Sequence, residues 1–151
     1  MTTIGEVCNH AVVFTSRDTP IAAAARPMRQ YHVGTVVIVD QMNGGKQRPV
    51  GIVTDRDLVV EVLATELDPR TITVGDVMTP ELATVRETEG LAEAMEIMRG
   101  KGVRRLPVVG DDRQLMGIVS IDDLLEVLAE QLTDLTRIVS REQTREAQAR
   151  R

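Results

Sequence analysis

The chain contains an internal duplication, in which two segments 70 residues apart carry nearly the same sequence. The pentapeptide TIGEV at 3–7 is matched by TVGDV at 73–77, and the same offset aligns Met28 with Met98. After a loop that is four residues longer in the first copy, an offset of 66 aligns GIVTDRDL at 51–58 with GIVSIDDL at 117–124. A repeat of this kind defines the folding unit, and binding sites commonly lie where two copies meet.

Each copy carries a pattern of strand, helix, strand, strand and helix. In the first copy, apolar residues recur at helical spacing from Ile21, and the apolar run at 36–39 predicts a strand buried on both faces. The polar loop that follows predicts a hairpin. The predicted strands are 12–14, 36–39, 49–53, 106–109 and 115–119, and the predicted helices lie near 21–28, 55–64, 91–98 and from about 121 onward. The expected fold class is α/β (α+β), with two pseudo-symmetric repeats packed through their sheets.

The repeats divide the chain into a first unit at 1–67, a second unit at 68–140 and a polar tail at 141–151 that we expect to fray. Units of about 60 residues are marginal alone, so the two should share a core. Pro27 falls inside a predicted helix, where we expect a kink or an early end. The last helix continues well beyond its counterpart, which predicts a partner surface; its apolar positions are Leu124, Leu125, Leu128, Leu132, Leu135, Ile138 and Val139.

The amino-acid composition narrows the range of functions expected for the chain. Phe14 and Tyr31 are the only aromatic residues, so the core is aliphatic and the chain has no aromatic platform on which to stack bases. A formal charge of −5 removes a broad attraction to nucleic acid or anionic membranes, although a local basic patch stays open. No run approaches the roughly 18 apolar residues of a membrane span. A single cysteine and the lack of a signal-peptide pattern lead us to expect a soluble, cytoplasmic protein.

The sequence offers no set of catalytic or metal-binding residues. His10 and His32 are the only histidines, and neither belongs to a metal-binding spacing. Cys8 lies near His10 in the sequence, but it aligns with Met78 in the repeat. Cys8 is therefore better explained as a small core residue than as a metal ligand. No standard glycine-rich phosphate loop is present. We therefore expect a protein that is not an enzyme and holds no metal.

The residues that stand out are two matched pairs, Thr54-x-x-Asp57 and Ser120-x-x-Asp123, each of which follows a Gly-Ile-Val strand and opens a helix. Such a pair is typical of a capping box, and one copy alone would be interpreted as a helix cap. Two copies at matched positions also suit a nucleoside phosphate. A helix start offers free N–H groups to phosphate, and the carboxylate can accept both hydroxyls of a ribose.

These motifs resemble those of a tandem pair of CBS domains, also called a Bateman module. The resemblance rests on DVMTP at 76–80, VRRLPVV at 103–109 and the twofold GIV-[T/S]-x-x-D-L, and it covers essentially residues 1–140. It is closest in kind to the small stand-alone bacterial members. The resemblance implies two clefts between the copies that bind AMP, ADP, ATP or S-adenosylmethionine, with NAD as a further candidate, and it implies no required cofactor.

By position in the family motif, Asp57 and Asp123 would bind ribose hydroxyls, with Thr54 and Ser120 near the ribose or phosphate. The resemblance places adenine against two apolar slots. The residues concerned are Val12 within 11–13 together with Val33, and Leu82 and Ala83 within 81–83 together with Val103.

The two copies differ in charge around these positions. Arg104 and Arg105 offer cations around the second site, where the first copy has Gly34 and Thr35. Conversely, Arg56 lies inside the first helix-start motif, opposite Asp122 in the second. An isolated arginine is more often a solvated surface residue, so clustering is what favours a phosphate role. We predict that the two clefts need not bind the same ligand equally.

The leading hypothesis is a non-enzymatic regulatory sensor that binds an adenosyl ligand and signals by a conformational or dimer change. Its expected partners are the ligand, a second copy of the chain in a homodimer and an unidentified regulated protein, with no nucleic acid and no membrane. Two alternatives stay open. One is a structural or protein-interaction module with vestigial clefts, and the other is a metal or redox sensor that uses Cys8, His10 and His32.

Overall fold

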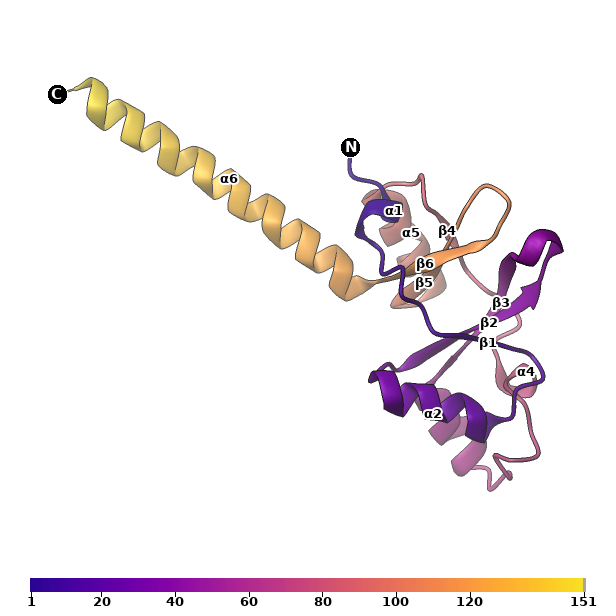
Figure 1. Ribbon diagram of the computed structural model, residues 1–151. Coiled ribbons are helices and arrows are strands. Elements are labelled where there is room, and N and C mark those ends of the chain that lie inside the picture. Colours follow the sequence, from indigo (N-terminus) through magenta and orange to yellow (C-terminus); the bar gives the residue numbers. More distant parts are fainter. Residues whose placement is uncertain (151) are drawn as a thin grey trace.

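The computed structural model describes residues 1–150 and contains two three-stranded sheets with the same topology. The first sheet has the order β1 (Phe14–Ser16), β2 (Thr35–Gln41) and β3 (Gln47–Thr54), and the second has β4 (Val85–Arg86), β5 (Arg105–Val109) and β6 (Leu115–Ser120). In each sheet the first two strands are parallel and the last two form an antiparallel hairpin. The predicted fold class and the predicted hairpins are confirmed (Figure 1).

Helices connect and follow these strands. The crossovers between the parallel strands are α2 (Ile21–Tyr31) and α5 (Leu91–Lys101), and both end at a left-handed residue, His32 with φ 54° and Gly102 with φ 66°. The remaining elements are α1 (Ile4–Val7), the 3-10 turn η1 (Asn43–Gly45), α3 (Asp55–Asp57), the π-helical turn η2 (Leu58–Leu63), α4 (Val74–Val77) and α6 (Ile121–Ala149). No helix among the described residues is long and apolar enough to cross a membrane.

Three local predictions were wrong in whole or in part. The first strand begins at Phe14, because Val13 contributes only its carbonyl, to the N–H of Val37 at 2.9 Å. The early end that was one of two expected effects of Pro27 does not occur, because α2 continues to Tyr31, held by Ala24 and Met28 in the core on either side of the proline. The helix expected at 55–64 is α-helical only at its start and then widens into a π-turn.

The polar tail also differs from expectation over residues 141–149, where it is helical. α6 runs without a break to Ala149. The residues at 141–149 are mainly Arg, Glu, Gln and Ala, whose high intrinsic helix propensity favours continuation of the helix.

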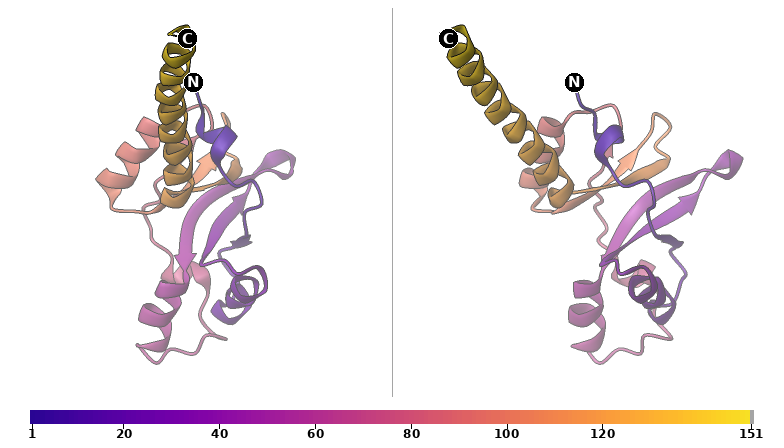
Figure 2. Two further views of the ribbon diagram at one scale, coloured as in Figure 1. Left: turned by 90° about the vertical axis from the view of Figure 1, so that its left-hand side faces the viewer. Right: turned by 60° about the vertical axis from the view of Figure 1, so that its left-hand side comes forward.

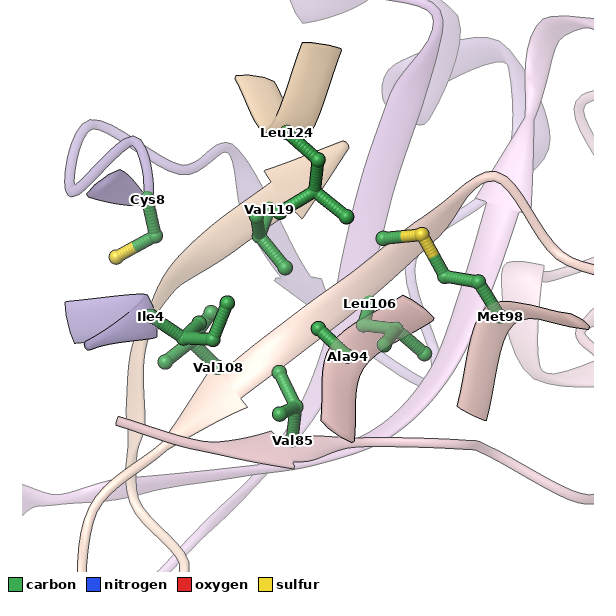
Figure 3. Close-up of a cluster of buried hydrophobic side chains, with 9 residues drawn as sticks. All are labelled: Ile4, Cys8, Val85, Ala94, Met98, Leu106, Val108, Val119 and Leu124. Carbon is green, nitrogen blue, oxygen red and sulfur yellow. The ribbon is translucent and has the colours of Figure 1, made fainter. Parts of the chain in front are cut away.

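The two repeats exchange their first helices. Ile4 of α1 and Cys8 just after it lie in the core of the second repeat (Figure 3), and the other members of that core are Val85, Ala94, Met98, Leu106, Val108, Val119 and Leu124. In return, Val74 of α4 joins the core of the first repeat, whose other members are Ile21, Ala24, Met28, Val36, Ile38, Val53 and Val62. The structure has two cores rather than one shared core, and each core is completed by a short helix from the other repeat.

Backbone hydrogen bonds fix the exchanged segments. The N–H of Gly5 donates to the carbonyl of Glu87 at 2.9 Å, and the N–H of Gly75 donates to the carbonyl of Arg17 at 2.9 Å. Because of this exchange, the segments that lead into β1 and β4 each cross from one sheet to the other. Both views in Figure 2 show the sheet regions side by side, with α6 projecting away from them.

Candidate functional site

The crossing segments create two clefts, each lined by residues from both repeats. Cleft A has a volume of about 540 Å³ and is lined by Thr35, Ile52, Thr54, Arg56, Asp57, Thr79, Glu81, Leu82, Ala83, Lys101, Gly102, Val103, Arg104 and Arg105. Cleft B, of about 250 Å³, is lined by Asn9, Ala11, Val12, Val13, His32, Val33, Gly34, Thr35, Arg105, Ile118, Ser120 and Asp123. The clefts are related by the pseudo-symmetry of the repeat.

In the structure, each cleft brings together predicted site residues from both repeats. In cleft A, the helix-start residue Asp57 of the first repeat shares a cavity with Val103 and Leu82 of the second. In cleft B, Asp123 of the second repeat shares a cavity with Val12 and Val33 of the first. Each helix-start motif therefore lies with the apolar slot of the other copy. Asp122 is exposed and lines neither cleft.

Both helix-start motifs form capping boxes. Thr54 Oγ1 accepts a hydrogen bond from the Asp57 N–H at 3.1 Å, and Asp57 Oδ2 accepts one from the Thr54 N–H at 2.9 Å. In the second motif, Asp123 Oδ2 accepts from the Ser120 N–H at 2.8 Å. Among the described residues, Oδ1 of neither aspartate takes part in a hydrogen bond. Each carboxylate can thus cap its helix and still offer one oxygen to a ligand.

Cationic side chains are concentrated in cleft A. Four of them, Arg56, Lys101, Arg104 and Arg105, face two acids, Asp57 and Glu81. In the lining of cleft B, Arg105 is the single arginine and there is no lysine. Arg104 lines cleft A together with the apolar slot of its own repeat and the helix start of the first repeat, and Arg105 lines both clefts.

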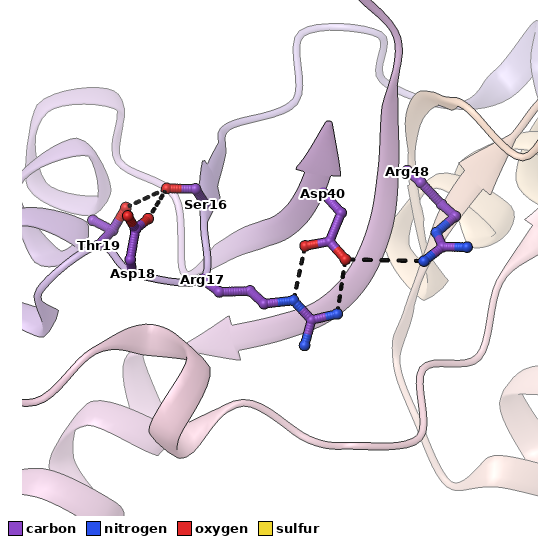
Figure 4. A network of polar contacts seen from close by, with 6 residues as sticks. All are labelled: Ser16, Arg17, Asp18, Thr19, Asp40 and Arg48. Atoms are coloured by element: carbon purple, nitrogen blue, oxygen red, sulfur yellow. Dashed lines mark hydrogen bonds and ion pairs between the residues drawn. The ribbon is translucent and has the colours of Figure 1, made fainter. Parts of the chain in front are cut away.

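The cations of cleft A have no salt-bridge partner, in contrast to Arg17. On a different surface, Arg17 donates two hydrogen bonds of 2.8 Å to Asp40, with Arg48 at 3.9 Å (Figure 4). The hydrogen bond from Arg17 is the main reason that the pKa of Asp40 is lowered. In the described part of the chain, no salt bridge involves the four cations of cleft A, so their charge is available to a ligand.

Sequence reasoning did not single out Thr35, which lines both clefts together with its repeat counterpart Arg105. The Thr35 side chain is 8% exposed, and its Oγ1 is buried without a hydrogen-bond partner in the protein. A buried hydroxyl without a hydrogen-bond partner costs free energy of folding. The offset of 70 could have revealed the pair, since it places both residues two positions after the valines of the apolar slots, Val33 and Val103.

The three residues of the metal hypothesis are not brought together. Cys8 Sγ lies 3.7 Å from His10 Nε2, but His10 also contacts the carbonyls of Gly5 and Met116 at 3.0 Å each. His32 lines cleft B instead. Within residues 1–150, no group of three potential ligands from His, Cys, Asp and Glu could hold a metal ion. Burial raises the pKa of the Cys8 thiol, which favours its protonated form.

Two exchanged α/β repeats with clefts between them define a tandem-repeat module. A family model described as "CBS domain" matches residues 4–64 and 74–130, so the chain belongs to the CBS-domain family and carries two copies of that domain. The resemblance identified from the sequence is confirmed.

Several known proteins are similar to the chain. An uncharacterised protein of Methanopyrus kandleri is 38% identical over 124 residues, which is 82% of this chain and 61% of that protein, so the chain spans about three fifths of this relative. Hypoxic response protein 1 of Mycobacterium tuberculosis is 34% identical over 130 residues, covering 86% of this chain and 87% of that protein.

Solved structures share the fold. Hypoxic Response Protein I with two coordinated zinc ions gives a TM-score of 0.71 at 32% identity, covering 83% of this chain and 98% of that chain. A CBS domain pair in complex with 5′-methylthioadenosine and S-adenosyl-L-methionine gives a TM-score of 0.71 at 24% identity, covering 84% of this chain and 99% of that chain. The second likeness concerns the fold alone.

Proposed function

We propose that the chain is a non-enzymatic regulatory module that binds an adenosyl ligand, such as AMP, ADP, ATP or S-adenosylmethionine, in the clefts between its repeats. The observation that carries the proposal is the composition of each cleft. A helix-start carboxylate with one unoccupied oxygen shares the cavity with an aliphatic slot from the other repeat. The carboxylate oxygen suits ribose hydroxyls, and the slot suits a base held without aromatic stacking.

The charge of cleft A extends the proposal to phosphates. Its cations lack acidic partners, and Arg105 lies where the two clefts meet. Guanidinium groups bind phosphate with strong, charge-assisted hydrogen bonds. A phosphate-bearing ligand is therefore expected in cleft A, whereas cleft B suits an adenosyl ligand with less negative charge.

Thermal unfolding with AMP, ADP, ATP, S-adenosylmethionine and NAD tests the proposal. A ligand at about 100 times its Kd should stabilise the protein by roughly 2.7 kcal/mol. Asp57→Asn and Asp123→Asn should each weaken binding at one cleft, because asparagine keeps a capping oxygen but loses the charge. Asp122→Asn is the matched control, since Asp122 starts the same helix outside the clefts. If no ligand shifts the unfolding temperature, the module is structural.

We propose also that the module acts as a homodimer, through which ligand binding reaches a regulated protein. Ligand binding shifts such an equilibrium only through different affinities for two states. Support for a dimer comes from α6, whose exposed apolar side chains include Leu132, Leu135 and Val139.

A further inference from the structure

The C-terminal two thirds of α6 has no packing partner within the chain. Every residue from Ala129 to Arg150 is exposed, and no other element lies beside this part of the helix (Figures 1 and 2). Leu132, Leu135 and Ile138 are 64%, 59% and 62% exposed. Most helical stability in proteins comes from packing an apolar face, so a projecting helix with an apolar face requires a partner.

The apolar residues of α6 follow a heptad pattern. Their spacing alternates between three and four residues, and the positions are Ile121, Leu125, Leu128, Leu132, Leu135 and Val139. This is the 3.5-residue period of a two-stranded coiled coil, in which the apolar seam of one helix packs against the same seam of another. The opposite side is polar, with Glu130, Thr133 and Arg137. The seam thus fits a second copy of itself.

Charge along α6 indicates how two copies align. The first half carries five acids and no base, at Asp122, Asp123, Glu126, Glu130 and Asp134. The second half, at 137–150, carries four arginines, Arg137, Arg141, Arg145 and Arg150, and two glutamates. A parallel pair would place the acidic halves side by side. An antiparallel pair places each acidic half beside a basic one and also opposes the helix dipoles.

We infer that α6 pairs antiparallel with α6 of a second copy, with Leu132 of each helix beside Leu135 of the other. In this register the end of one helix lies along the start of the other, where α5 and α6 border an apolar groove of about 820 Å³. Leu125 and Leu128 belong to both the groove and the seam. The inference rests on the proposed homodimer but not on the ligand, since no seam residue lines cleft A or cleft B.

The mass of the purified chain in solution, measured by light scattering, tests the pairing. The expected mass is about twice the 16.6 kDa of one chain. The double variant Leu132→Gln with Leu135→Gln should be monomeric, because it makes the centre of the seam polar. Thr133→Gln with Ser140→Gln is the matched control on the polar face and should stay dimeric. A monomeric unmodified chain, or a dimeric seam variant, overturns the inference.

The distance between two spin labels tests the orientation. Labels at Gln148→Cys in a Cys8→Ala background should lie about 40 Å apart in the antiparallel pair, from a rise of 1.5 Å per residue. A parallel pair would bring them within about 15 Å, near the spacing of the helix axes. Labels at Asp134→Cys, near the centre, should be close in either orientation and report that the dimer has formed. A short distance at residue 148 overturns the antiparallel arrangement.

Discussion

Gly117 in β6 packs directly against Cys8 from the other end of the chain. A Cβ atom on residue 117 would lie 2.8 Å from Cys8 Sγ and 2.7 Å from the backbone carbonyl oxygen of Asn9. Asn9 and Ile118 exchange two backbone hydrogen bonds of 2.9 Å at this point. The glycine therefore allows the exchanged N-terminal segment to lie against the second sheet, and the equivalent Gly51 lies against Met78.

Gly117→Ala should destabilise the protein by about 1–3 kcal/mol, because the added methyl group meets backbone that is fixed by hydrogen bonds. Gly51→Ala is the matched comparison and should cost less, because its closest neighbour is the flexible side chain of Met78. Denaturant unfolding of both variants measures the difference. Equal losses would argue against a special role of the contact with the fixed Asn9 backbone.

The Cys8 thiol should be unreactive at neutral pH and should make stability depend on alkaline pH. Burial is the main cause that raises its pKa above the usual 9.0. A raised pKa means that the folded state holds the proton more tightly than the unfolded state. The contribution of the protonated thiol to the free energy of unfolding is therefore complete below the ordinary pKa, and it is lost as pH rises through the raised pKa of the folded state. Denaturant unfolding between neutral and alkaline pH measures this loss.

Cys8→Ala serves as the control, because it removes the titrating group while other groups titrate unchanged. The variant should lose less stability than the natural sequence over the same pH range. Thiol modification of the folded chain should also be much slower than that of the unfolded chain. Rapid modification of the folded chain would contradict the burial of Cys8.

Pro27→Ala should stabilise the protein by on the order of 1–3 kcal/mol. The proline lies inside α2, where it lacks a donor and is costly, although its rigidity in the unfolded chain offsets part of that cost. The reciprocal change, Ile97→Pro in α5, should destabilise by about 3 kcal/mol or more. Unfolding curves of the two variants compare equivalent positions in the two repeats. A neutral Pro27→Ala would mean that α2 has adapted fully to the proline.

The duplication, the strand order and the hairpins could be predicted from sequence because apolar periodicity reports local burial directly. The exchange of α1 and α4 between the repeats could not be predicted from the sequence. Ile4 and Val74 are equivalent apolar residues on equivalent short helices, and nothing in their pattern says which of two similar cores each one enters. The same ambiguity explains why the site could be predicted only in part. The residues of both clefts could be chosen by motif, but the assignment of Arg104 to a cleft depends on the exchange.

Arg104→Ala should weaken binding of ATP or ADP about tenfold or more and leave S-adenosylmethionine binding nearly unchanged. The guanidinium lines the cationic cleft A, and hydrogen bonds to charged groups are worth about 1.5–3 kcal/mol each. Calorimetric titration with each ligand measures the difference. Arg99→Ala is the matched control, because Arg99 is an exposed arginine outside both clefts. Equal effects of the two variants would remove the phosphate role from Arg104.

Thr35→Val should stabilise the unliganded protein by about 1 kcal/mol and weaken ligand binding several-fold. The substitution conserves volume and removes a buried hydroxyl that has no partner in the protein, which relieves a desolvation cost. Thr35 lines both clefts, so a small rotation of its side chain on ligand binding would let the hydroxyl form a hydrogen bond with the ligand. Thr35→Ser should show the opposite pattern, with lower stability from the lost methyl group but retained binding. Opposite signs in the two variants, measured by thermal unfolding and calorimetry, would assign the hydroxyl to the ligand, whereas a destabilised Thr35→Val would assign it to the fold.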